Sequence, residues 1–180
     1  MSTDRQKSFI GTLKLNGNPV NIIQTESEGF PDALVAGLPL PAAQIYFRFE
    51  HGHYVLYIRS EGDYFGRLVR EENNGDINVG EVAGSATISF NIQKNGRTVT
   101  LDDMNTNTQT INITTNNGST LYVQNSICAP SPIPHTHSAT YKKFPKHATF
   151  TTTSGKHCSA EFELTILERN APYLNNPGEI

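Results

Sequence analysis

Short apolar runs separated by turn residues are the feature that most constrains the fold of this chain. Apolar and β-branched residues recur a few at a time, and Gly, Asn, Asp and Pro residues interrupt them. Such runs are typical of β-strands, whereas the three-to-four-residue spacing of an amphipathic helix is nearly absent. We therefore predict an all-β chain of about twelve short antiparallel strands.

Turn residues set the boundaries of these strands. Asn-Gly pairs at 16–17, 95–96 and 117–118 and a His-Gly pair at 51–52 favour tight turns that need a positive φ. One helical turn is predicted at 32–36, inside an otherwise irregular segment, 25–43. The predicted strands are 9–15, 20–24, 44–50, 53–59, 64–70, 77–82, 86–92, 97–101, 110–114, 120–124, 148–153 and 160–167.

Alternation within a strand predicts which face is buried. In 44–50, Ile45, Phe47 and Phe49 alternate with more polar neighbours, so one face is expected in the core and the other in solvent. In 160–167 the apolar residues at 162, 164 and 166 are expected to point inward in the same way.

A weak internal repeat indicates how the strands could be arranged. A small residue followed by Phe recurs in Ala43 to Phe47, in Ala86 to Phe90 and in 148–150, and the first two copies are 43 residues apart. Twelve strands with a three-fold period near 45 residues resemble a β-trefoil, in which six strands close a barrel and six cap it. The chain has no Trp, so it lacks the Gln-x-Trp signature of ricin-type trefoil lectins. A β-trefoil or other small closed barrel and a two-sheet β-sandwich or jelly roll remain the alternatives.

The length of 180 residues favours one domain, expected at 1–169. Four prolines between 126 and 147 prevent a continuous strand there, so this segment is predicted to be an inserted ordered loop or arm. Residues 170–180 are expected to form a loosely held tail.

Charge and hydropathy limit the partners. The net charge is −3 and the pI is about 6.0, and no basic run exceeds Lys142-Lys143, so nucleic acid is not an expected partner. No apolar stretch is long enough for a membrane span, and the first residues show no apolar secretion signal. The chain is expected in the cytoplasm as encoded, or released by a non-classical route.

Histidines and cysteines are the candidate metal ligands. His51 and His53, and likewise His135 and His137, stand two residues apart, so an extended chain would put each pair on one face. The first pair is similar to the His-x-His of the cupin metal site, but Tyr and Ile stand where that pattern has Glu. The weak candidates for a zinc site are His51, His53, Cys128, His135, His137 and His157. Zinc is the one cofactor considered, and local hydrogen bonding by loop histidines is the alternative.

The two cysteines have a second interpretation. A disulfide between Cys128 and Cys158 would close a loop of about 30 residues and stabilise the fold by roughly 3–4 kcal/mol. Two ordinary thiols are the alternative, because a reducing cytosol disfavours the bond.

The sequence shows little that is typical of a catalytic site. The chain has no Gly-x-Ser-x-Gly elbow and no phosphate-binding Gly loop. The carboxylate pairs at 71–72 and 102–103 are chain neighbours in turns, where carboxylates are more often solvated than catalytic. We therefore expect a binding protein rather than an enzyme.

Polar and aromatic loop residues are the candidate ligand site. Sugar hydroxyls pair with amides and carboxylates, and aromatic rings cover sugar C–H patches. The competing interpretation is that turns require Asn, Asp and Gly sterically and that Tyr is common on strands. The candidates are Tyr54, Tyr57, Tyr64, Phe65, Arg67, Asn73, Asn74, Asp76, Asp102, Asp103, Asn105 and Asn107.

Three functional hypotheses follow. The leading one is a lectin-like module for glycans or glycoproteins, made multivalent by the three-fold repeat or by homo-oligomerisation. The second is a protein-directed module, inhibitor-like or toxin-like, that uses the loop at 126–147. The third is a metal-dependent cupin-like enzyme.

Overall fold

The computed structural model describes residues 3–23, 32–81, 88–124, 147–155 and 157–171, and the regular secondary structure within them is almost entirely antiparallel strand. This confirms the all-β prediction. A short helix, α1 (Asp4–Lys7), precedes the sheet, and a 3₁₀ turn, η1 (Leu101–Asp103), follows its ninth strand. The strands are β1 (Phe9–Leu15), β2 (Asn18–Ile23), β3 (Asp32–Ala36), β4 (Ile45–Glu50), β5 (His53–Ile58), β6 (Leu68–Glu71), β7 (Ile77–Gly80), β8 (Phe90–Lys94), β9 (Arg97–Val99), β10 (Thr108–Thr115), β11 (Tyr122–Gln124), β12 (Ala148–Thr151), β13 (Cys158–Ser159) and β14 (Glu161–Arg169).

The strand pairings form a closed barrel. They run from β1 through β2, β3, β7, β6, β5, β8, β10 and β14 back to β1, a circuit of nine strands. Strand β4 pairs with β1 on one side and β5 on the other, and so joins two sides of this circuit. A closed barrel, rather than a two-sheet sandwich or jelly roll, is therefore the architecture observed.

Strand β4 also closes a smaller ring of six strands, in the order β1, β4, β5, β8, β10 and β14. The ring contains the first and last strands of three successive units. These units are β1 to β4, β5 to β8, and β10 to β14 without β13. In each unit the first strand pairs with the last, and the last pairs with the first strand of the next unit.

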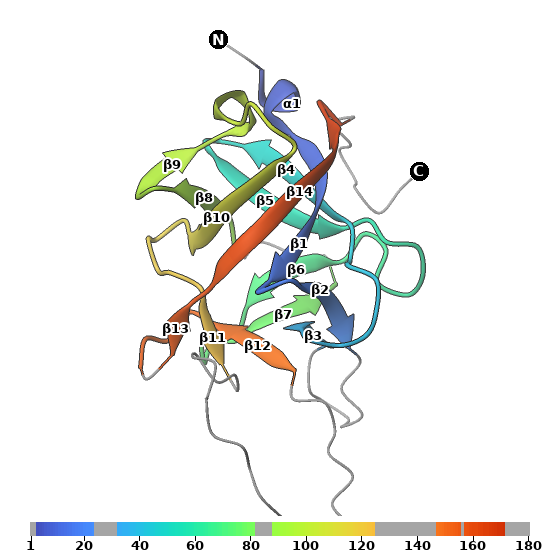
Figure 1. Cartoon of the computed structure of the whole chain (residues 1–180), viewed down its shortest axis with the longest axis vertical. Coiled ribbons are helices and arrows are strands. Elements are labelled where there is room, and N and C mark those ends of the chain that lie inside the picture. Colours follow the sequence, from blue (N-terminus) through green and yellow to red (C-terminus); the bar gives the residue numbers. More distant parts are fainter. Residues whose placement is uncertain (1–2, 24–31, 82–87, 125–146, 156, 172–180) are drawn as a thin grey trace, which may run out of the picture.

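The inner strands of the three units meet at one end of the ring. Each unit contributes one antiparallel pair there: β2 with β3, β6 with β7, and β11 with β12. Strand β3 joins the pairs, because it bonds to both β7 and β12. Figure 1 shows these six strands together below the larger ring strands.

The register around the six-strand ring determines its width. When the paired residues are followed from strand to strand once around the ring, the path returns to β1 at a different residue. The offset is two residues along β5, four along β10 and six along β1, twelve in all. With standard strand spacings, this offset tilts the strands by about 55° to the barrel axis. Such a tilt widens the barrel, and aromatic rings fill it: the Phe9 ring stacks on that of Phe47 at 4.5 Å, and the Tyr54 ring meets both edge-on.

The outer face of β4 and β5 differs from the prediction. Tyr46 is one of the neighbours of Ile45 and Phe47 that alternation places on the solvent face, yet it is only 1% exposed. It packs with Val55, Tyr57, Leu68 and Ala171 in a second, smaller apolar cluster. Burial on both faces explains why β5 reads as a near-continuous apolar run rather than an alternating one.

The helical turn predicted at 32–36 is wrong, because these residues form β3. Tertiary pairing outweighs the local signal here. Leu34, Val35 and Ala36 are buried, and β3 is bonded to β2, β7 and β12.

The sequence repeat identified two of three equivalent strands. Phe47 and Phe90 lie in β4 and β8, the last strands of their units. Phe150 lies in β12, an inner strand, whereas the last strand of the third unit is β14, where Ala160 precedes Phe162. The motif therefore marks the last strand in two units and an inner strand in the third.

Two sequence predictions fall mostly on other parts of the chain. Most of the proline-rich segment 126–147 and of the tail 170–180 lies outside the described residues.

Within the described residues, no helix is both long and apolar enough to cross a membrane.

Candidate functional site

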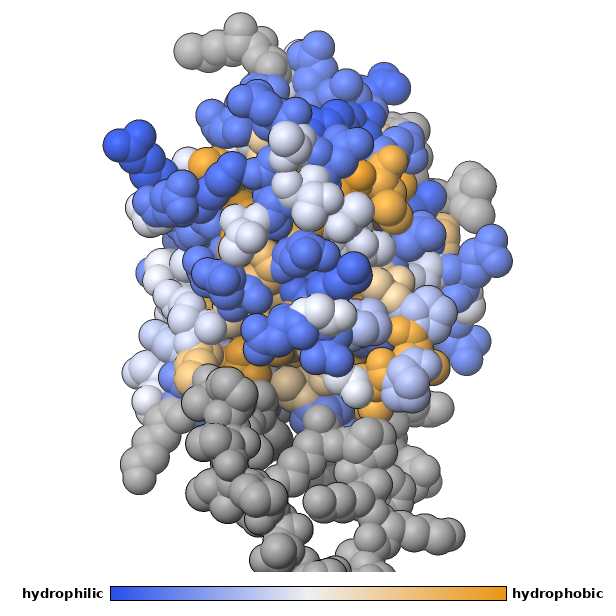
Figure 2. Space-filling view, in the orientation of Figure 1, coloured by the Kyte–Doolittle hydropathy of each residue, from blue (hydrophilic) through white to orange (hydrophobic). Residues whose placement is uncertain are grey.

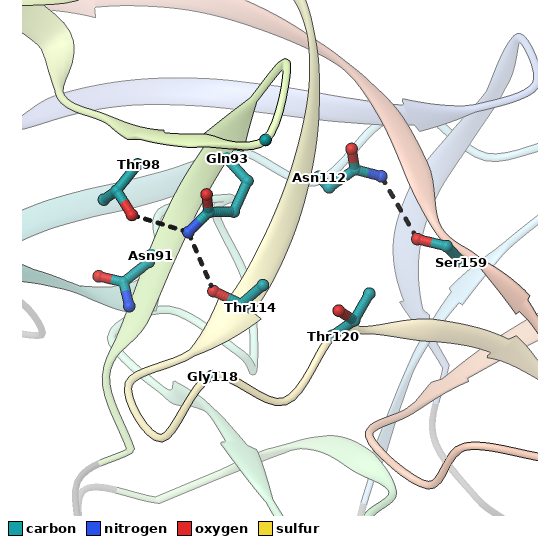
Figure 3. A pocket seen from close by; sticks show the side chains of 9 residues that line it. Asn91, Gln93, Thr98, Asn112, Thr114, Gly118, Thr120 and Ser159 are labelled. Atoms are coloured by element: carbon teal, nitrogen blue, oxygen red, sulfur yellow. Dashed lines mark hydrogen bonds between the residues drawn. The ribbon is translucent and has the colours of Figure 1, made fainter.

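A polar groove lies on the outer face of the barrel where β8 pairs with β10. Its volume is about 540 Å³. The hairpin β8–β9, the turn before β11 and strand β13 border it (Figure 3). The described residues that line it are Asn91, Gln93, Gly96, Thr98, Asn112, Thr114, Gly118, Thr120 and Ser159.

Strand alternation produces the polar floor of this groove. Asn112 pairs with Gln93 across the two strands, and Thr114 pairs with Asn91. The residues between them, including Ile92 and Ile113, point the opposite way into the core. The period of two in each strand thus separates an amide and hydroxyl face from an apolar one.

Hydrogen bonds orient the side-chain amide of Gln93. Its Nε2 donates to Thr98 Oγ1 at 2.8 Å and to Thr114 Oγ1 at 3.5 Å. These contacts connect the edge strand β9 to β10 across β8, as Figure 3 shows. Each hydroxyl that accepts from Gln93 keeps its own hydrogen for a further partner.

Asn112 and Asn91 are held by backbone carbonyls. Asn112 Nδ2 donates to the Ala160 carbonyl at 2.9 Å and to Ser159 Oγ at 3.5 Å. Asn91 Nδ2 donates to the Thr115 carbonyl at 3.5 Å, and Asn91 Oδ1 bonds to His53 Nδ1 at 2.8 Å. A carbonyl can only accept, so these contacts fix which end of each amide is nitrogen.

Two glycines in tight turns keep the groove open. Gly96 has a φ of 74° and Gly118 a φ of 90°. A Cβ added at either position would meet no atom within 4 Å. Each turn needs glycine for its backbone, and the missing side chains leave room beside the floor.

Two of the tyrosines predicted for the ligand site are buried. Tyr54 is 1% exposed and lies in the barrel core, where its hydroxyl bonds to Leu101 N and Lys7 O. Tyr57 is 6% exposed and belongs to the second apolar cluster. Neither side chain is available to a ligand, because Tyr54 points into the core and Tyr57, on the opposite face of β5, is covered by the second cluster.

The remaining aromatic candidates form a separate surface group. Tyr64, Phe65 and Arg67 are half-buried. The Arg67 guanidinium lies 5.3 Å from the Tyr64 ring centre, and its Nη1 lies 3.1 Å from Asp32 Oδ2. Burial and the nearby Asp32 carboxylate raise the pKa of Tyr64. Arg59 stacks on Phe65 at 4.6 Å in the same loop.

The Asn73 to Asp76 turn is bound to the barrel rather than open to a ligand. Asn74 Nδ2 donates to Asp76 Oδ2 at 2.7 Å, and the Gly75 carbonyl accepts from Thr152 N at 2.8 Å. Asn73 is exposed at the tip. The contacts inside the turn and with Thr152 favour the structural interpretation of these residues.

The acidic candidates lie in and after η1, where Asp103 Oδ2 accepts from Thr100 N at 2.8 Å. Arg169 donates to the Met104 and Thr106 carbonyls and to Asn107 Oδ1, and so holds the following loop. A pocket of about 300 Å³ forms beside it, lined by Gln6, Leu101, Asp102, Met104, Asn105, Arg169 and Asn170. Asp102 and Asn105 share this pocket, but they are not part of the groove on β8 and β10.

The metal candidates do not come together within the described residues. His51 sits in a turn with a φ of 50°, so it does not share an extended face with His53, whose Nδ1 bonds to Asn91. Cys158 is in a disulfide, and His157 precedes it. Cys128, His135 and His137 lie outside the described residues, within which no three potential ligands are grouped for a metal ion.

The three outer faces between units are chemically different. We call each such face, where the last strand of one unit pairs with the first strand of the next, a seam. The β4–β5 seam carries Tyr46 opposite Tyr57, and the β14–β1 seam carries an ion pair between Lys14 and Glu163 at 3.3 Å. The β8–β10 seam carries the amide and hydroxyl groups, so the expected repetition of one site three times is not seen in the described residues.

Apolar side chains do not form a broad patch on the face shown in Figure 2, where hydrophilic and neutral residues surround separate apolar spots. Among the described residues, the exposed large hydrophobic side chains are Leu40 and Leu167.

Comparison of the chain with protein-family models, curated proteins and solved structures finds no match. The geometry of the groove is therefore the basis for the function proposed below.

Proposed function

We propose that this chain is a lectin-like protein that binds glycans in the groove of the β8–β10 seam. The observation that supports this most is the described lining of the groove, which is made of amides, hydroxyls and glycines and includes no charged side chain. Sugar hydroxyls both donate and accept hydrogen bonds, and amides and hydroxyls offer matching groups. Threonine methyls and bare glycine backbone supply the apolar contacts.

The proposal includes the finer fold assignment, a β-trefoil. Its support is the closed ring of six strands, made from the first and last strands of three units, with three antiparallel pairs at one end. Strands β9 and β13 are additions to that plan, and both border the groove.

A glycan array probed with the labelled full chain tests the function. Saturable binding to a set of related glycans is expected, and isothermal titration with the best of them then gives a Kd. An array without binding would contradict the proposal.

Two matched variants test the location. Gly96→Asn places a side chain in the groove wall, and Gly17→Asn makes the same change in another Asn-Gly turn. The φ values are 74° and 78°, so the backbone strain is similar, and an added Cβ meets no atom within 4 Å at either site. We expect Gly96→Asn to weaken binding at least about tenfold, equivalent to about 1.4 kcal/mol, and Gly17→Asn to leave it unchanged. Equal affinities for the two variants would place the glycan elsewhere.

A second pair of variants removes one hydroxyl group each. Thr114→Val deletes a groove hydroxyl while keeping the shape of the side chain, and Thr110→Val does so on the same strand outside the lining residues. A threefold to tenfold loss of affinity is expected for the first variant only, since one hydrogen bond contributes about 0.5–1.5 kcal/mol.

A further inference from the structure

We infer that the groove selects neutral glycans and rejects glycans that carry a carboxylate or sulfate. The inference rests on the proposed function and specifies the ligand class of the same site. It depends on the direction of the side-chain amides and on the charges around them.

Two of the three amides of the floor, those of Gln93 and Asn112, present acceptor oxygens, whereas the oxygen of Asn91 is already bonded to His53. The nitrogen of Asn112 is engaged by the Ala160 carbonyl, and that of Gln93 by two threonine hydroxyls. Asn112 Oδ1 and Gln93 Oε1 have no hydrogen-bond partner within the described residues. Figure 3 shows both oxygens on the side away from these bonds. An open acceptor needs a donor from the ligand, which a sugar hydroxyl or an acetamido N–H supplies and a carboxylate or sulfate oxygen does not.

The described lining of the groove also offers no compensating cation. None of its described lining residues is basic. Lys94 and Arg97 pair with each other next to Gln93 and Thr98, so alternation points them to the other face of the hairpin, where Lys94 bonds to Gln109. An anion moved from water into such a site loses hydration without gaining a counter-charge, which is costly.

A carboxylate lies beside the floor. Glu161 is the direct partner of Asn112 across β10 and β14, and it is exposed. Side chains directly opposite in an antiparallel pair are about 5 Å apart, so the edge of the groove carries negative charge. This charge and the net charge of −3 both act against an anionic ligand.

The test compares two forms of one oligosaccharide, the neutral one and the same core with sialic acid or sulfate added. We expect the full chain to bind the neutral form at least about tenfold more tightly at 0.15 M salt. Thr98→Lys adds a cation to the groove wall and should reduce this ratio at least threefold. Thr110→Lys adds the same charge outside the lining residues and should change the ratio by less than twofold.

The outcomes distinguish the two proposals. Preference for the neutral form, reduced by Thr98→Lys alone, supports the inference. Equal or tighter binding of the anionic form, still lost in Gly96→Asn, overturns the inference and keeps the proposed function. Absence of binding to both forms, and to every glycan on the array, overturns both.

Discussion

The phenol oxygen of Tyr54 accepts a hydrogen bond of 3.0 Å from the backbone amide of Leu101. The same hydroxyl donates to the Lys7 carbonyl at 3.3 Å. One core side chain thereby connects the barrel to η1 and to α1, which are 47 residues away on either side of it in sequence.

Replacing Tyr54 with Phe should therefore destabilise the fold. The ring would keep its packing against Phe9 and Phe49, but the buried Leu101 amide would lose its acceptor. The expected loss in the free energy of unfolding is about 1–3 kcal/mol, measured by urea denaturation. Tyr64→Phe is the control, because the Tyr64 hydroxyl makes no hydrogen bond within the described residues. Equal losses in both variants would show that the bond to Leu101 contributes little.

The stability of the protein should fall in alkaline solution. Burial raises the pKa of Tyr54 well above its ordinary value of 10. Above pH 10 the unfolded chain therefore releases a proton that the native chain retains, so stability decreases as pH rises, by up to about 1.4 kcal/mol per pH unit. Urea denaturation at several pH values between 8 and 11 should show this decrease, and the loss of unfolding free energy per pH unit should be smaller in Tyr54→Phe. The same loss per pH unit in that variant would assign the decrease to other groups.

Two glycines should respond differently to alanine. A Cβ at Gly11 would lie 2.9 Å from the Thr165 carbonyl oxygen, a backbone atom of the neighbouring strand, whereas the three atoms nearest to one at Gly80 all belong to the Arg70 guanidinium, at 2.5, 2.6 and 2.7 Å. A side chain can move and a paired strand cannot, so Gly11→Ala should cost about 1–3 kcal/mol and Gly80→Ala distinctly less. Thermal unfolding of the two variants gives the comparison, and a larger loss for Gly80→Ala would contradict it.

Reduction of the disulfide at Cys158 should also lower stability. The sequence contains 2 cysteines, so a disulfide within the chain closes the loop from 128 to 158. This bond should stabilise the folded state by roughly 3–4 kcal/mol. Denaturation with and without a reductant measures the difference, and Cys158→Ser should match the reduced protein. Free thiols detected in the unreduced, denatured protein would exclude the bond in solution.

Local patterns predicted the strands well and their partners poorly. The run 9–15 was predicted with the bounds that β1 has, because alternation and an Asn-Gly turn are both local signals. Strand β3 was missed, because its conformation depends on β2, β7 and β12, which a single sequence does not pair with it.

The groove was missed for the same reason. Its lining comes from separate segments, and Asn112 and Ser159, which bond across it, are 47 residues apart. The available signal was the alternation of Asn91, Gln93, Asn112 and Thr114 with core residues, which marks an outer face but not its partner. The composition of the turns indicated Asn74 and Asp76 instead, but the polar groups of these residues form hydrogen bonds within their own turn.

Under the proposed function, the difference between the three seams limits what one molecule can do at a glycan-bearing surface. Within the described residues the polar groove lies at one of the three seams, so one molecule would hold one sugar chain there and would coat such a surface without bridging it to another. Agglutination would then need a second copy of the chain, with the two grooves facing apart, and the β14–β1 seam, where Lys14 and Glu163 are exposed, is a face that lies outside the groove.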